Sequence, residues 1–93
     1  MDYENIEIYK NALSSFGIEA QEKMVMEECA KLIDAICKRF RNRISVEDII
    51  TELADVHIMV EQMAVYYGLK EFEIEKKHKI NRLIEKLNLH TNN

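Results

Sequence analysis

The sequence contains no proline, no tryptophan and only two glycines in 93 residues. Proline and glycine interrupt helices more strongly than other residues, so their scarcity favours long, unbroken helices. Long hydrophobic runs are missing too, and none approaches the roughly 20 residues that span a membrane. The acidic, amphipathic start of the chain differs from a signal peptide. We therefore expect no membrane partner.

The chain also lacks an excess of positive charge, because 13 Lys and Arg residues are outnumbered by 17 Asp and Glu residues. The formal net charge of −4 argues against a nucleic-acid polymer as partner, since such polymers are bound mainly through their phosphates. The only two cysteines, Cys29 and Cys37, lie two helical turns apart, too far for a disulfide with each other. They are typical of small core residues in a reducing compartment, and we expect a cytoplasmic protein.

Glu, Lys, Ile, Leu, Met and Ala are abundant, which is the composition of a nearly all-helical protein. Apolar residues at helical spacing predict helices over residues 3–14, 19–40, 45–68 and 70–87. Ser45 is expected to cap the third helix and Gly68 to close it. Connections shorter than about eight residues favour antiparallel neighbours. We expect one all-α domain over residues 1–93, an antiparallel four-helix arrangement.

The hydrophobic share of the chain, 47%, is large for so short a sequence. A domain of this size has a small core, and apolar residues left outside it need another surface to cover them. We therefore expect the apolar remainder of the first two helices to pack against a second copy, in a homodimer or a homotetramer. The last helix is expected to face its own core through Phe72, Ile80, Leu83, Ile84 and Leu87.

The third predicted helix carries two acidic residues on or near its apolar side. Its apolar stripe comprises Ile49, Leu53, Val56, Val60, Met63 and Tyr67. Glu52 falls inside this stripe, and Asp55 follows three residues later. An ionised carboxylate on a core-facing stripe costs several kcal/mol unless it is paired or bound to a cation. Three arrangements would explain the position of Glu52 and Asp55: a Lys or Arg partner, a solvated edge of the core, or a cation site.

The second predicted helix supplies a third acid. Glu28 lies beside the apolar stripe of that helix, whereas Glu27 points away from it. Antiparallel helices packed roughly 8–10 Å apart bring such carboxylates together. Three anions in a low-dielectric cleft need a cation, and oxygen ligands suit Mg²⁺, which keeps open positions for water and phosphates.

Three segments, MEECAKLIDAI, ITELADVHIMVEQM and KINRLIEKL, resemble the all-α nucleoside triphosphate pyrophosphohydrolases of the MazG-like superfamily. The resemblance covers about residues 18–87 and includes Gln21 ahead of the acidic pair. The family signature is Glu-x-x-Glu on one helix and Glu-x-x-Asp on the next. It implies a MazG-like domain with a four-carboxylate Mg²⁺ site, in which Mn²⁺ can substitute. Three of the four ligand positions are matched, by Glu28, Glu52 and Asp55.

The chain departs from this signature at Lys31, which stands where the second Glu of the first motif belongs. Three interpretations stay open. The site binds fewer or weaker metals and still acts, with Glu27 or Asp34 partly compensating. Alternatively, Lys31 reaches past the metal and holds a substrate phosphate. In the third interpretation the site is inactive and Lys31 forms a salt bridge within it.

The resemblance also implies substrate-phosphate contacts for Lys79 and Arg82 on the last helix. From the residues alone, these side chains and Lys86 are typical of a solvated charged face. The implied activity is Mg²⁺-dependent hydrolysis of a nucleoside or deoxynucleoside triphosphate to the monophosphate and pyrophosphate, with Glu28 as a catalytic residue and Glu27 as a candidate base. The alternatives are a catalytically degenerate dimeric binding or scaffold module, and a phosphoribosyl-ATP or dUTP pyrophosphohydrolase.

Overall fold

The computed structural model describes residues 3–91 and shows an all-helical chain. A short 3-10 turn (Tyr3–Asn5) leads into four α-helices, which are α1 (Ile6–Phe16), α2 (Ile18–Phe40), α3 (Val46–Tyr67) and α4 (Leu69–Thr91). Over this described stretch there is no β-strand, which confirms the predicted all-α class. None of the helices in that stretch combines the length and the apolar character that crossing a bilayer requires.

Two glycines and one serine mark the breaks between helices, as predicted. Gly17 separates α1 from α2 with a φ of 85°, and Gly68 separates α3 from α4 with a φ of 144°. Glycine adopts such positive φ values with the least strain, because it has no Cβ. Ser45 caps α3, since its Oγ accepts a hydrogen bond of 3.2 Å from the backbone N–H of Asp48.

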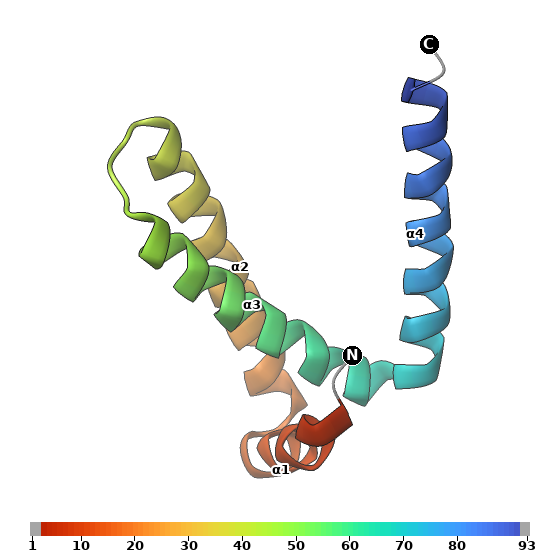
Figure 1. Cartoon of the computed structure of the whole chain (residues 1–93). Coiled ribbons are helices and arrows are strands. Elements are labelled where there is room, and N and C mark those ends of the chain that lie inside the picture. Colours follow the sequence, from red (N-terminus) through yellow and green to blue (C-terminus); the bar gives the residue numbers. More distant parts are fainter. Residues whose placement is uncertain (1–2, 92–93) are drawn as a thin grey trace.

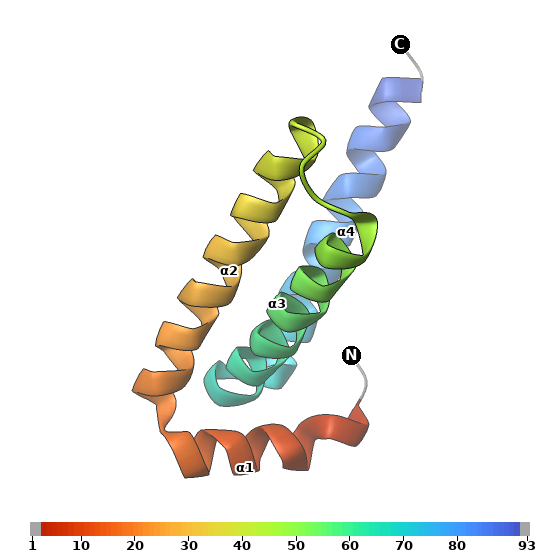
Figure 2. The same ribbon diagram turned by 90° about the vertical axis from the view of Figure 1, so that its left-hand side faces the viewer.

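α2 and α3 form an antiparallel pair, and α1 lies across one end of that pair in contact with both helices (Figures 1 and 2). The buried apolar side chains of the described chain lie on these three helices, and they are Tyr9, Ala35, Met59 and Ala64. Four polar side chains are buried with them, and they are Gln21, Glu28, Glu61 and Gln62. The core is therefore small, and half of its buried side chains need hydrogen-bond or charged partners.

α4 extends away from this pair rather than alongside it (Figure 1), and among the described helices it contacts α3 alone. The prediction of antiparallel neighbours is thus confirmed for α2 and α3, and it is wrong for α1, which lies across their end, and for α4, which extends away from them. Four residues predicted to face inward from α4 are 47–56% exposed, because α4 does not pack along the pair of α2 and α3; they are Ile80, Leu83, Ile84 and Leu87. α4 also ends at Thr91 rather than at residue 87, since no glycine or proline stops it there.

The chain exposes more surface than its size requires. A compact monomer of 11.0 kDa exposes about 5,600 Å², whereas this chain exposes 7338 Å². Its radius of gyration is 16.3 Å, against about 12 Å for a compact domain of this length. Large apolar side chains on all four helices are more than a third exposed, so much of the excess surface is apolar.

Candidate metal centre

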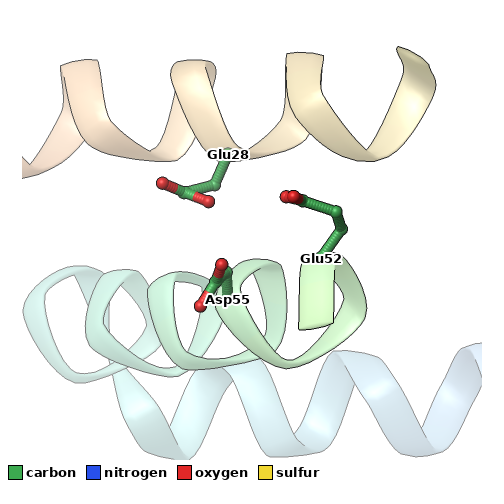
Figure 3. A group of neighbouring side chains, drawn as sticks. All are labelled: Glu28, Glu52 and Asp55. Carbon is green, nitrogen blue, oxygen red and sulfur yellow. The ribbon is translucent and has the colours of Figure 1, made fainter. Parts of the chain in front are cut away.

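Three carboxylates from two helices meet between α2 and α3. One carboxylate oxygen from each of Glu28, Glu52 and Asp55 lies within 4.8 Å of the other two. Glu52 and Asp55 are three residues apart, so they project from the same side of α3 toward Glu28 on α2 (Figure 3). The predicted convergence of these three residues is therefore confirmed as geometry.

Two oxygens of this carboxylate group are buried and accept no hydrogen bond, Oε2 of Glu28 and Oε2 of Glu52. Glu28 as a whole is only 8% exposed. A buried carboxylate oxygen without a donor carries its full desolvation penalty, and neighbouring anions repel one another. A bound divalent cation removes both costs. The donor set is oxygen only, which suits a hard ion such as Mg²⁺ or Mn²⁺.

Lys31 lies one turn after Glu28 on α2 and places a positive charge next to the carboxylate group. Its Nζ is 3.4 Å from Oε1 of Glu28, and its side chain is 59% exposed. Strong charge-assisted hydrogen bonds are shorter, roughly 2.7–2.9 Å. The contact is long and exposed on the lysine side although Glu28 itself is buried, so it compensates only part of the cost of burying Glu28. Lys31 therefore partners one oxygen of Glu28 and leaves both buried Oε2 atoms without a donor.

The two acids considered as compensating ligands lie elsewhere. Glu27 is exposed on α2 and does not belong to the group of facing carboxylates. Asp34 forms an ion pair with Lys38, whose Nζ lies 2.8 Å from its Oδ2. The structure thus brings neither Glu27 nor Asp34 into the group formed by Glu28, Glu52 and Asp55.

The predicted phosphate contacts lie on α4, apart from the carboxylates. Lys79, Arg82, Leu83 and Lys86 line a shallow recess of about 290 Å³. The Nζ of Lys79 lies 3.7 Å from Oε1 of Glu75, which is an exposed ion pair. Because α4 contacts only α3 and points away from α2, a single chain does not bring these cations to Glu28.

Sequence reasoning missed a buried polar layer where α1 crosses α2 and α3. The Tyr9 hydroxyl donates a 2.6 Å hydrogen bond to Oε1 of Glu61, and Nε2 of Gln21 donates one of 2.8 Å to Oε1 of Gln62. At about 100° per residue, Glu61 lies half a turn around the helix from Glu52. Periodicity therefore directs it away from α2, and only the crossing of α1 buries it.

Comparison with known proteins adds no relative. No family model matches the chain, and neither a curated protein nor a solved structure gives a significant match. The MazG-like resemblance accordingly stays a prediction that rests on the motifs themselves.

Proposed function

We propose that this chain is a Mg²⁺-dependent pyrophosphohydrolase of the MazG-like kind, which converts a nucleoside or deoxynucleoside triphosphate to its monophosphate and pyrophosphate. The observation that carries the proposal is the carboxylate group between α2 and α3, in which two buried oxygens lack a donor. The motif resemblance supports it at the same three residues. Free Cys29 and Cys37 fit a reducing cytoplasm, where such nucleotides are found.

In this proposal Glu28, Glu52 and Asp55 hold Mg²⁺, for which Mn²⁺ can substitute. The ion would polarise phosphate oxygens and lower the pKa of a bound water. Glu28 is the better placed base, because it belongs to the carboxylate group and would lie beside the ion and the attacking water. Glu27 is exposed on the same helix and would have to act from outside the group. Hydrolysis breaks the P–O–P linkage between the α and β phosphorus atoms.

The test is pyrophosphate release by the purified protein with Mg²⁺, across standard and modified nucleoside triphosphates, phosphoribosyl-ATP and dUTP. We expect turnover of at least one substrate and its loss in Glu52→Gln. The melting temperature should rise with Mg²⁺ in the unaltered protein. No turnover of any substrate, together with no Mg²⁺-dependent change in melting temperature, would refute the enzyme proposal.

The non-catalytic alternative is favoured by one observation, the ion pair between Lys31 and Glu28 inside the candidate site. In that case the fold serves as a dimeric binding or scaffold module. Lys31→Glu separates the two proposals, because it restores the fourth carboxylate of the family signature. Hydrolysis that appears only in this variant supports the degenerate module. If the rate of hydrolysis is lower in this variant than in the unaltered chain, the ammonium group takes part in the reaction.

We further propose that the chain associates with a second copy through the apolar side of α4. Its excess exposed surface is about 1,700 Å² over a compact monomer, which exceeds the roughly 800 Å² that each partner buries in a standard interface. On α4 this exposed surface includes Ile80, Leu83, Ile84 and Leu87. In such an assembly, Lys79 and Arg82 of one copy would approach the phosphates bound at another.

Sedimentation or light scattering tests this association. We expect a dimer or tetramer for the unaltered chain and a shift toward monomer for Leu83→Asp, which places a charge on the apolar side of α4. His78→Asp is the matched control, because it adds the same charge on the opposite side of that helix. A monomer at high protein concentration, or equal effects of both variants, contradicts the interface.

A further inference from the structure

The charges around the candidate metal centre are three carboxylates and one ammonium group. Glu28, Glu52 and Asp55 each offer an oxygen within 4.8 Å of the others, and Lys31 touches Glu28 from the solvent side with its Nζ 3.4 Å away. With one divalent cation, three carboxylates and one ammonium group the local charge is zero. With two divalent cations the same residues carry an excess of two positive charges, which a partly buried site disfavours.

The carboxylate oxygens that lack a hydrogen-bond donor also favour a single cation. The ammonium group of Lys31 reaches Oε1 of Glu28, so it does not use the buried Oε2 atoms of Glu28 and Glu52. Those two atoms and Asp55 remain available to one cation. Lys31 itself is loosely held, since its side chain is 59% exposed and its contact is long. Its four-carbon stem is flexible, and an ammonium group acts as a mobile point charge for phosphate.

We propose that the site takes a single divalent cation and that Lys31 acts as a tethered second cation, paired with Glu28 without substrate and with a substrate phosphate when a polyphosphate binds. This inference rests on the proposed function for its substrate class. It also makes Lys31 a working part of the site rather than a residue that disables it. Removal of the positive charge of Lys31 should therefore tighten the binding of the metal ion and weaken the binding of a polyphosphate.

Titration with Mn²⁺, followed by the electron paramagnetic resonance signal of the free ion, measures the number of sites without any turnover. We expect one Mn²⁺ per unaltered chain and two per chain in Lys31→Glu. In Lys31→Gln we expect one Mn²⁺, bound on the order of tenfold more tightly because a nearby positive charge is gone. Inorganic tripolyphosphate, titrated in the presence of Mn²⁺, should bind on the order of tenfold more weakly to Lys31→Gln.

Lys38→Gln is the matched control, because Lys38 also pairs with an acid on α2, Asp34, but lies nearly three turns from Glu28. It should change neither titration. Two Mn²⁺ ions per unaltered chain would overturn the single-cation inference and leave the proposed hydrolysis intact. One Mn²⁺ per chain without turnover of any nucleotide would overturn the hydrolysis and leave the inference standing. No Mn²⁺ binding at all, or equal responses of Lys31→Gln and Lys38→Gln, overturns the inference.

Discussion

The Tyr9 hydroxyl and the Glu61 carboxylate join α1 to α3 across 52 positions of the chain, through a buried hydrogen bond of 2.6 Å. The other carboxylate oxygen of Glu61 lies 3.4 Å from Nε2 of His57, which is itself largely exposed. Glu61 is 6% exposed, and these two contacts compensate for the burial of its carboxylate. The contact between α1 and α3 is therefore held by a polar pair as well as by apolar packing.

Replacing Tyr9 by Phe keeps the ring and removes the donor to Glu61. We expect a loss of about 1–3 kcal/mol in the free energy of unfolding, because a buried carboxylate oxygen loses its hydrogen bond. Urea denaturation followed by circular dichroism measures it. Tyr66→Phe is the control, since Tyr66 is 49% exposed and should cost far less. If the free energy of unfolding falls by the same amount in the two variants, the hydrogen bond of the Tyr9 hydroxyl adds nothing, and the ring of Tyr9 holds α1.

Alkaline titration should single out Tyr67. Its hydroxyl donates a hydrogen bond to the Glu22 carboxylate, which raises the pKa of Tyr67 above its ordinary value of 10.0. Because the folded-state pKa is raised, the stabilising contribution is complete below pH 10 and is lost as the pH rises through that folded value. The tyrosinate absorbance of the unaltered chain, minus that of Tyr67→Phe, isolates this group.

The Glu22→Gln variant should lower the pKa of Tyr67 toward its ordinary value, because the negative charge that opposes deprotonation is removed. Glu19→Gln, on the same helix and paired with Lys23 at 3.7 Å, serves as the control. If the pKa of Tyr67 falls by the same amount in both variants, the general charge of α2 and not the hydrogen bond raises it.

Glu52→Gln should change stability in opposite directions with and without metal. In a chelator it removes repulsion within the carboxylate group, and we expect a gain of roughly 1–3 kcal/mol. With Mg²⁺ at 100 times its Kd, the unaltered chain gains about 2.7 kcal/mol by linkage, and the variant gains little. Thermal melting in EDTA and in Mg²⁺ measures both effects.

Glu27→Gln is the control for that experiment, because Glu27 is an exposed acid on α2 outside the carboxylate group. Its response to Mg²⁺ should match that of the unaltered chain. A Mg²⁺ response that survives in Glu52→Gln and disappears in Glu27→Gln would place the cation on the other side of α2.

Sequence pattern predicts the carboxylate group well because its geometry is local. The spacing of Glu52 and Asp55 fixes their common direction, and one short connection pairs α2 with α3, which brings Glu28 opposite them. Periodicity identifies the apolar side of α4 equally well, but it does not show whether this side packs against the same chain or against another copy. Ile84 and Leu87 were thus expected in a core that the single chain does not form.

The turn at Gly68 directs α4 away from α3, and its substitution tests whether that direction matters for assembly. Gly68 has a φ of 144°, which residues with a Cβ rarely adopt. An added Cβ would lie 2.5 Å from Oε2 of Glu71, but this is the end of a flexible side chain that can move. The cost of Gly68→Ala therefore comes from the backbone, on the order of 1–3 kcal/mol.

Gly17→Ala is the matched control, because Gly17 also has a positive φ, 85°, with open space around its Cβ position. Both variants should lower the free energy of unfolding, as urea denaturation will show. Only Gly68→Ala should also alter the sedimentation behaviour, since relief of its strain re-aims α4 and with it Leu83 and Ile84. If Gly68→Ala is destabilised but assembles like the unaltered chain, the direction of α4 is not what positions the interface, and the contact must lie on α1, α2 or α3.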